Sequence, residues 1–548
     1  MNSIRSSGKR IISGLFFLLI LLSASSCNRF IVYPSELTAT ALANFPTSPI
    51  TTQEEYSHII PTQSSEITKE ISNSNPTPVE TEKPLIVSTA EETLEENSNQ
   101  QLPISIQETL TPNQYTPTPE NTSTPKSTIG PPFLYYTQSG DTLDAIAARF
   151  MVNLDMITSP EPFPQDGFID ANHLLLIPNV IGEHGPSDKI IPDSEFIFSP
   201  TAIDFNIEDF VSNAGGYLST YKEYRSEGWL NGAQVVEKIA LENSINPRLL
   251  LSILEQQSGW VYGQPENIAQ KDYPIGHVEY QYKGLYHQLR WCVEHLAYGY
   301  YGWRQGTLTE ITFPDESVMR LDPQLNAGTI ALQFMYANLF NEREWGGMLY
   351  APDGLPSLHE KMFGNPWIRD QAVNPLFPIN IEQPEFDLPF REGETWNFTG
   401  GPHPAWGPNG CLSALDFAPP MDNPGCLPTE KIVTAITSGL VVRTAVGVVV
   451  VDTDGDGIEQ TGWSILYVHV GHVDKVEVGT WVNTNDKIGY PSCEGGYSTG
   501  THIHVARKYN GEWIAADGPL PFELSGWTPI NGEKPYEGMM VRNDEVAI

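Results

Sequence analysis

The stretch Thr499-Gly-Thr-His-Ile-His-Val-Ala-Arg507 decides the fold expected for the C-terminal part of this 548-residue chain. Its β-branched residues, and the turn-forming Ser498-Thr499-Gly500 that opens it, predict a strand entered from a tight loop. Successive side chains of a strand point to opposite faces, so His502 and His504 should project from the same face, about 6 to 7 Å apart. Two converging imidazoles indicate a metal site, and a strand with two solvent-facing histidines is the alternative.

The composition of the whole chain limits the classes of protein to which it can belong. A length of 548 residues suffices for three or four domains, each with its own core. The formal net charge of −37 argues against a nucleic-acid partner, since phosphates require clustered Lys and Arg. With 45 Pro, 45 Gly and 40% hydrophobic residues, the chain is typical of globular units joined by extended linkers, and not of an integral membrane protein.

Residues 1–27 resemble a bacterial lipoprotein signal peptide. A basic segment ending at Arg10 precedes the apolar run Ile11–Leu22, which is too short to span a bilayer, and Cys27 follows shortly after. The resemblance implies export to the cell envelope, with lipid on Cys27 anchoring the protein to the outer face of a membrane. Ala24 stands where the pattern usually has Leu, and cleavage without lipid is the alternative.

The next segment, residues 28–131, is rich in Ser, Thr, Pro and Glu and has few aromatic residues. Such a composition buries too little apolar surface to offset the entropy of the chain. We therefore expect a disordered stalk that provides reach between the anchor and the folded domains.

Residues 132–180 have the pattern of a small ordered module. A strand at Tyr135-Tyr136-Thr137, a helix capped near Ser139-Gly-Asp-Thr-Leu143, a second helix at 154–157 and a closing strand at Leu174–Pro178 predict a βααβ unit. These motifs resemble a LysM module, although the segment Ser159–Asp170 is longer than usual. The resemblance implies binding to N-acetylglucosamine-containing glycan, chiefly peptidoglycan, and a LysM fold that has lost its ligand is the alternative.

Residues 196–385 are predicted to be mainly helical, because apolar residues recur at helical spacing on both sides of Asn246-Pro247. The stretch Ile245–Leu251, followed by Glu255-Gln-Gln-Ser-Gly259, resembles a lysozyme-like transglycosylase domain. That family carries its general-acid Glu directly before the Ser, where this chain has Gln257. A carboxamide cannot donate and recover a proton, and Glu255 lies about 200° away around the helix. We expect a non-catalytic glycan-binding domain; a muramidase with another carboxylate, or a structural spacer, are the alternatives.

From residue 390 to 530 the chain is rich in Gly, β-branched residues and turns, which predicts antiparallel sheet. Gly400-Gly-Pro-His403, Ser413-Ala-Leu-Asp-Phe417, Tyr467-Val-His469 and the His502-x-His504 strand resemble the lysostaphin and β-lytic family of zinc metalloendopeptidases, which includes LytM-like peptidoglycan peptidases. His403 precedes Asp416 by 13 positions. This long loop fits the β-lytic branch, whereas the common family form would place a His at Leu412.

The resemblance implies a role for each motif residue. His403, Asp416 and His504 would bind Zn²⁺, with water in the fourth position of an open tetrahedral site. His469 and His502 would be the catalytic pair. One would assist deprotonation of the attacking water, and the other would stabilise the oxyanion or protonate the leaving amine.

Two further motifs accompany this constellation. A disulfide is plausible among the last three cysteines of an exported protein, with the pairing left open and Cys292 alone in a helix; these three are Cys411, Cys426 and Cys493. The acidic run Asp452–Gly457 resembles the start of a calcium loop, but Trp463 occupies the position of its bidentate acid, so an acidic hairpin turn is favoured.

The sequence as a whole predicts a multidomain α+β protein: a disordered stalk, a small LysM module, a helical domain and an antiparallel β domain, with a C-terminal tail at 531–548. We expect a zinc metalloendopeptidase that cleaves peptide bonds of bacterial peptidoglycan and is targeted by LysM. A catalytically inactive envelope protein that binds peptidoglycan and activates or organises other hydrolases is the alternative.

Overall fold

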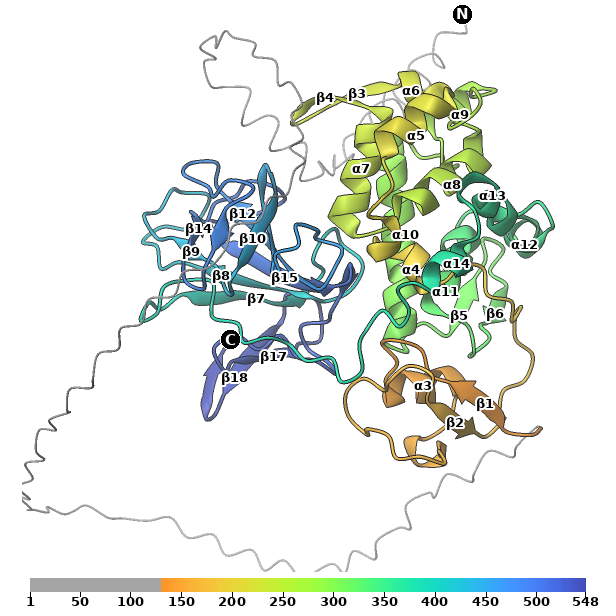
Figure 1. The fold of residues 1–548 in the computed structure, drawn as a ribbon, viewed down its shortest axis with the longest axis horizontal. Coiled ribbons are helices and arrows are strands. Elements are labelled where there is room, and N and C mark those ends of the chain that lie inside the picture. Colours follow the sequence, from red (N-terminus) through yellow and green to blue (C-terminus); the bar gives the residue numbers. More distant parts are fainter. Residues whose placement is uncertain (1–129) are drawn as a thin grey trace, which may run out of the picture. The chain divides into compact units, whose positions relative to one another are not determined.

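The computed structural model describes residues 130–548, which combine helices with antiparallel sheets (Figure 1). The predicted signal peptide with Cys27, and the predicted stalk apart from its last two residues, lie outside the described residues. Within 130–548, no helix combines the length and the hydropathy needed to cross a bilayer.

The first described unit is the small module. Strands β1 (Phe133–Tyr136) and β2 (Leu174–Ile177) pair antiparallel and flank helix α3 (Leu143–Phe150) and the short 3-10 helix η1 (Leu154–Met156). Helix α3 begins where expected, because the Thr142 hydroxyl accepts a hydrogen bond from the Ala145 N–H. The strand–helix–helix–strand order is therefore as predicted, with the second helix reduced to one 3-10 turn.

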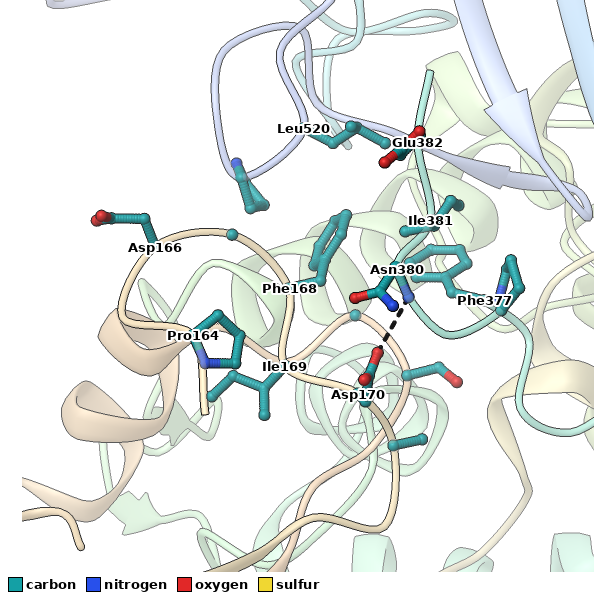
Figure 2. A pocket seen from close by; sticks show the side chains of 16 residues that line it. Pro164, Asp166, Phe168, Ile169, Asp170, Phe377, Asn380, Ile381, Glu382 and Leu520 are labelled. Carbon is teal, nitrogen blue, oxygen red and sulfur yellow. Dashed lines mark hydrogen bonds between the residues drawn. The ribbon is translucent and has the colours of Figure 1, made fainter. Parts of the chain in front are cut away.

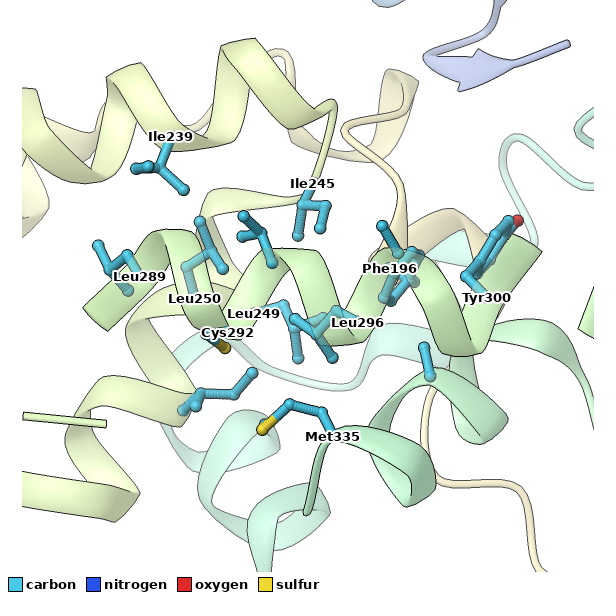
Figure 3. Packing of buried hydrophobic residues seen from close by; sticks show 14 of the residues in the cluster. Phe196, Ile239, Ile245, Leu249, Leu250, Leu289, Cys292, Leu296, Tyr300 and Met335 are labelled. Atoms are coloured by element: carbon cyan, nitrogen blue, oxygen red, sulfur yellow. The ribbon is translucent and has the colours of Figure 1, made fainter. Parts of the chain in front are cut away.

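The second unit is helical, and its core is built on the long helix α10 (Leu285–Arg304). Helix α8 (Pro247–Ser258) starts at the predicted Asn246-Pro247, since the Asn246 side chain caps it and Pro suits the first helical position. Leu249, Leu250, Leu289 and Leu296 pack between α8 and α10 (Figure 3). The other helices are α4 (Asp193–Phe196), α5 (Ile207–Ala214), α6 (Tyr217–Thr220), α7 (Gly232–Asn243), α9 (Ile268–Asp272), α11 (Ala327–Ala337), α12 (Glu342–Tyr350), α13 (Leu355–Phe363) and α14 (Pro366–Asp370).

Two short hairpins and two 3-10 turns complete the helical unit. They are β3 (Lys222–Arg225) with β4 (Gly228–Asn231), β5 (Glu310–Thr312) with β6 (Val318–Arg320), η2 (Pro200–Ala202) and η3 (Tyr280–Tyr282).

The third unit is an antiparallel sheet in which the neighbours run β13-β10-β11-β12-β15-β8-β7, with β16 added to β15. Its strands are β7 (Asn397–His403), β8 (Ala414–Ala418), β10 (Gly439–Ala445), β11 (Gly447–Asp452), β12 (Trp463–Val470), β13 (Trp481–Val482), β15 (Ile503–Tyr509) and β16 (Glu512–Trp513). A separate pair joins β9 (Val433–Thr434) to β14 (Lys487–Gly489).

The segment predicted as a C-terminal tail also forms strands. Residues 531–548 contribute to a three-stranded sheet of β17 (Thr528–Asn531), β18 (Gly538–Arg542) and β19 (Glu545–Ala547). The Gly401 N–H of β7 donates to the carbonyl of Tyr536, in the β17–β18 turn, at 2.9 Å. The chain end is thereby attached to the strand that leads to His403.

The two faces of the large sheet pack into different cores, because side chains alternate along each strand. Ile465, Tyr467 and Val505 belong to a core within the β unit. Leu466, Val468, Ala506 and Trp513 instead share a core with the helices. The Glu512 carboxylate on β16 accepts hydrogen bonds from the Arg304 guanidinium at 3.0 Å and the Tyr300 hydroxyl at 3.0 Å, so the helical unit and the sheet form one packed body at this face.

Candidate metal centre

Three neighbouring strands bring the predicted ligand residues together. In the register of the sheet, His504 of β15 lies opposite Asp416 of β8, and Asp416 lies opposite Gly400 of β7, which ends at His403. The His403 Nε2 atom is 2.9 Å from His504 Nδ1 and 3.3 Å from Asp416 Oδ1, and His504 Nδ1 is 3.1 Å from the same oxygen. These three side chains are buried and their candidate ligand atoms all lie within 4.8 Å of one another.

Backbone carbonyls select the tautomer of each ligand histidine. The His403 Nδ1 atom is 2.7 Å from the Gly401 carbonyl, and His504 Nε2 is 3.1 Å from the Ala405 carbonyl. A carbonyl only accepts hydrogen bonds, so those nitrogens carry the protons, and His403 Nε2 and His504 Nδ1 keep free lone pairs. Both lone pairs face Asp416, which as a carboxylate is also only an acceptor. Three acceptors that converge without a donor between them form a set of ligand atoms suited to a cation.

The donor set fits zinc. Two imidazole nitrogens and one carboxylate oxygen are the protein ligands of a hydrolytic zinc site that leaves its fourth position open. Asp416 forms ion pairs only with histidines among the described residues, and no Lys or Arg neutralises it. The residues present would therefore hold a divalent cation by both geometry and charge.

The predicted catalytic pair lies beside this cluster. The rings of His469 and His502 are 4.3 Å apart, and His502 Nε2 lies 3.6 Å from Asp416 Oδ2. His469 Nδ1 donates to the Glu494 carbonyl at 2.8 Å, and His502 Nδ1 donates to the Gly500 carbonyl at 2.8 Å. The Nε2 atoms of both rings are thus left free to exchange protons.

Burial and the neighbouring charges set the ionisation of the cluster. Burial alone would raise the pKa of Asp416, but the interactions with the adjacent imidazoles of His403 and His504 outweigh it and hold that pKa well below its usual range. Burial, with the charges of His502 and His504, lowers the pKa of His469 to about 3. Burial also lowers the pKa of His504 and outweighs the neighbouring Asp416 carboxylate, which by itself would raise that pKa. The imidazoles of His469 and His504 are accordingly neutral near pH 7, as metal binding and proton acceptance require.

His469 is also unusual in its backbone. It is the last residue but one of strand β12 and has a φ of 69°, in the left-handed region that non-glycine residues rarely adopt. Such a conformation persists only where the surroundings enforce it, and it often accompanies a functional site. The pairing of β11 with β12 shifts register here, because Gly447 pairs with Val470 and Val448 with Val468, so His469 is the extra residue of a bulge. In contrast, the nearby His472 has a side chain that is 79% exposed, in accordance with its lack of a motif position.

Tyr536 is the residue of this site that sequence reasoning missed. Its ring stacks on that of His403 at 4.1 Å with an interplanar angle of 22°. Burial and the charge of Asp416 raise the pKa of the Tyr536 phenol. Tyr536 belongs to no recognisable motif and lies in a segment expected to be a tail, so only the packing of the β17–β18 turn on β7 could reveal it.

The cysteines resolve the pairing that the sequence left open. Cys426 and Cys493 form a disulfide, whereas Cys411 and Cys292 are buried free thiols, the latter in helix α10. The disulfide joins two loops next to the metal centre.

The acidic run after β11 forms a turn into β12. Oxygens of Asp452, Asp454 and Asp456 lie within 4.8 Å of one another. Asp452 accepts the Gly457 N–H at 2.9 Å, and burial together with its two acidic neighbours raises its pKa to about 6. Trp463, where a calcium loop needs an acid, is already the first residue of β12, so the segment is an acidic hairpin turn.

In the helical unit, the residues compared with a transglycosylase site do not form one. The Glu255 carboxylate, in the last turn of helix α8, accepts hydrogen bonds from the backbone N–H groups of Val261 and Tyr262 at 2.8 and 3.0 Å, just after the end of that helix. The buried Gln257 amide nitrogen lacks a hydrogen-bond partner. A proton donor is therefore missing from the position where that family has its general acid.

The fold and the site thus define a helical domain joined to an antiparallel β domain with a buried His₂Asp cluster. A family model described as LasA, N-terminal domain, matches residues 189–377, which is most of the helical unit. The lysozyme-like interpretation of the same residues stays a prediction.

The sequence comparison finds relatives named Protease LasA. The chain is 26% identical to Protease LasA of Pseudomonas aeruginosa strain UCBPP-PA14 over 348 residues, covering 60% of this chain and 75% of that protein. It is 25% identical to Protease LasA of Pseudomonas aeruginosa strain PAO1 over 351 residues, with the same coverage.

Solved structures show more limited likenesses. The M23 metalloprotease pseudoalterin, from the deep sea, is 22% identical, with a TM-score of 0.26, and the match covers 30% of this chain and 95% of that one. The catalytic domain of the antimicrobial peptidase lysostaphin from Staphylococcus simulans is 25% identical, with a TM-score of 0.17, and the match covers 22% of this chain and 89% of that one.

Proposed function

We propose that this protein is a zinc metalloendopeptidase that cleaves peptide bonds of bacterial peptidoglycan. The observation that supports this proposal best is the convergence of two imidazole nitrogens and the Asp416 carboxylate on one point, with the pair His469 and His502 beside it. The sequence relationship to Protease LasA supports a peptidase. Peptidoglycan as the substrate rests on the resemblance of the motifs to lysostaphin-type enzymes.

The chain's own groups have separate tasks in this proposal. His403, Asp416 and His504 would hold Zn²⁺, which when bound supplies Lewis-acid chemistry to water and to the scissile carbonyl. His469 and His502 each present a free Nε2 to the site, so one ring would accept the proton of the attacking water, and the proton that the pair gains in this way would then be donated to the leaving amine. The carbonyls of Glu494 and Gly500 keep both rings in the required tautomer during this exchange.

The small module supports targeting to a glycan. A cavity of about 280 Å³ lies between Ser139-Gly140, the segment 164–171 and the residues around Phe377 and Asn380, which follow helix α14 (Figure 2). The Phe168 and Phe377 rings, 5.3 Å apart, line its apolar side, while the Asp170 carboxylate accepts the Asn380 N–H at 3.2 Å. Aromatic faces with hydrogen-bonding groups at the rim are suited to amino sugars, so we assign LysM-type glycan binding to this cavity.

The remaining parts of the proposal concern the helical unit and the location. We assign the helical unit a non-catalytic role, because Gln257 replaces the acid and Glu255 is held by backbone N–H groups. The signal-like residues 1–27 support export and a lipid anchor on Cys27, so that LysM binding would raise the local concentration of substrate around the peptidase site.

The alternative is a catalytically inactive envelope protein that binds peptidoglycan and activates or organises other hydrolases. The two functions differ in the metal content and in the products. We expect purified protein to contain one zinc per chain by mass spectrometry, to release new free amino groups from peptidoglycan, and to lose this activity in a chelator until zinc is restored. Wild-type protein that is free of zinc and inactive, but still sediments with peptidoglycan, would establish the alternative.

A further inference from the structure

The Cys426–Cys493 disulfide lies within the segments that hold the two catalytic histidines. On one side of Cys493, the Ser492 N–H donates to the His469 carbonyl at 2.7 Å, and the Ser492 hydroxyl donates to the same carbonyl at 3.0 Å. On the other side, the Glu494 carbonyl accepts the proton of His469 Nδ1. The residues on both sides of the cross-linked cysteine therefore fix both the backbone and the ring of His469.

The same loop also holds His502. The Ser498 hydroxyl is 3.2 Å from Cys493 Sγ and 3.2 Å from His502 Nδ1. Ser492 and His502 form an isolated antiparallel bridge. Next to the other cysteine, the Gly425 carbonyl accepts the Thr501 N–H at 3.1 Å, directly before His502. Both ends of the disulfide are thus one residue away from a contact that positions a catalytic ring.

The ligand histidines are held in a different way. Asp416 and His504 pair in neighbouring strands, and the second nitrogens of His403 and His504 bind the carbonyls of Gly401 and Ala405. None of these contacts involves a residue of the two disulfide-bonded loops. Losing the disulfide should consequently disturb the catalytic pair and leave the ligand set in place.

The loops themselves have little other support. Between Gly489 and Ile503 the only pairings are isolated bridges, and residues 419–432 contain no helix or strand. Segments of this kind regain much conformational entropy when a cross-link is removed. His469 additionally keeps a left-handed backbone, with a φ of 69°, that its neighbours must enforce.

We infer that the Cys426–Cys493 disulfide is a positioning element for His469 and His502. This inference rests on the proposed peptidase function, since it concerns the residues assigned to proton transfer there. According to this inference, different parts of the structure position the two sets of histidines. The disulfide fixes the orientation of the catalytic rings, and the β-strands fix the metal ligands.

The test compares the full-length wild type with the double variant Cys426→Ala/Cys493→Ala, which leaves no new thiol that could bind zinc. We expect kcat on a peptidoglycan peptide to fall on the order of 10- to 100-fold, as for displacements of about 1 Å at a catalytic group. KM and the zinc content should remain within twofold. Hydrogen exchange measured by mass spectrometry should accelerate for amides of residues 490–502, and not for strands β8 and β15, also in chelator-treated protein.

A matched control is Val451→Ala, which removes buried side-chain volume from strand β11 in the same β unit and should lower the melting temperature without changing kcat. The inference is overturned if the double variant keeps its kcat, if it loses zinc together with activity, or if exchange in residues 490–502 is unchanged. A wild type that holds zinc and cleaves nothing would contradict the proposed function instead, while the exchange measurement would still decide whether the disulfide orders this loop.

Discussion

Two buried histidine clusters in this chain show what distinguishes a functional site from a structural one. In the helical unit, His359 lies 2.8 Å from the Ser252 hydroxyl and 3.4 Å from the Glu195 carboxylate. The same carboxylate forms a bidentate ion pair with Arg369. In the β unit, His403 and His504 point free nitrogens at Asp416. In the first cluster the Arg369 guanidinium neutralises the carboxylate of Glu195. In the second cluster no Lys or Arg of residues 130–548 neutralises Asp416, so its negative charge is available for a metal cation.

The amino-acid types in the two clusters are similar, and both clusters are buried. A serine, a histidine and a glutamate in contact even have the composition of a hydrolytic triad. However, Ser252 donates to the Arg248 carbonyl one turn earlier in helix α8, and Arg369 occupies both oxygens of Glu195. Composition and proximity therefore do not define a site, whereas unsatisfied lone pairs that converge do. The following changes test this distinction, from the largest expected effect to the smallest.

Replacing a ligand should abolish function while the fold persists. We expect His504→Ala to lose both stoichiometric zinc and all detectable peptidase activity, since two ligands no longer hold the cation. Metal analysis and cleavage assays on the same preparation check this outcome, with circular dichroism as the control for folding. A variant that retains zinc would show that His504 is not a ligand.

Replacing a catalytic histidine should lower the peptidase activity without changing the zinc content. His469→Asn keeps a residue type that tolerates the left-handed backbone but removes the proton acceptor. We expect kcat to fall about 10²- to 10⁴-fold with zinc still bound. The exposed histidine of the same domain supplies the control, His472→Ala, which should keep full activity. Equal losses in the two variants would contradict the assigned roles.

The helical cluster should respond in the opposite way. Glu195→Ala leaves the guanidinium of Arg369 and the imidazole of His359 without their carboxylate, which should lower the free energy of unfolding by about 3 to 5 kcal/mol. Zinc per folded molecule should not change. Denaturant unfolding measures the first quantity, and the exposed Glu266→Ala provides a comparison that should stay within about 0.5 kcal/mol of wild type. A loss of zinc from folded Glu195→Ala protein would break the distinction between the clusters.

The same carboxylate should make stability depend on pH. Burial opposes ionisation of Glu195, but hydrogen bonds from His359 and Arg369 outweigh it, so its pKa in the folded protein is lower than the ordinary value of 4.5. Because the pKa of this carboxyl group is lower in the folded protein than in the unfolded chain, its ionised form stabilises the fold. This stabilisation is complete at pH values above the unfolded-state pKa and is lost as the pH falls through the folded-state pKa. We expect wild type to lose more stability than Glu195→Gln as the pH falls below about 4.5. Parallel curves in denaturant titrations would refute this.

The smallest effect should come from restoring the residue type of a transglycosylase. Gln257→Glu places a carboxyl group where the amide nitrogen is buried and unpaired. Since the single carboxyl meets no assembled site, we expect no reducing ends to be released from peptidoglycan. Glycan cleavage by this variant would show that the helical unit retains a latent active site.

Much of the fold was accessible from local sequence signals. The helix that begins at Pro247, the long helix from Leu285 and the βααβ order of the small module all follow from capping residues and apolar spacing, which act over a few positions. Other boundaries depend on tertiary pairing. The apolar run Ile432–Val442 is divided between β9 and β10, with residues 435–438 outside both strands, because β9 pairs with β14 and β10 pairs with β11.

The chemical identities of the candidate site were set by the sequence alone: His403, Asp416, His469, His502 and His504 stand at fixed positions in motifs, and Gln257 removes the acid from the helical unit. Only the tertiary structure decided the features that depend on contacts between segments far apart in the sequence. These are the choice of Cys426 as the partner of Cys493, the stacking of Tyr536 on His403, and the sharing of one core by the helices and the sheet. The physical reason is that a motif specifies donors and spacing along one strand, whereas the direction of a lone pair is fixed by carbonyls that folding brings from elsewhere.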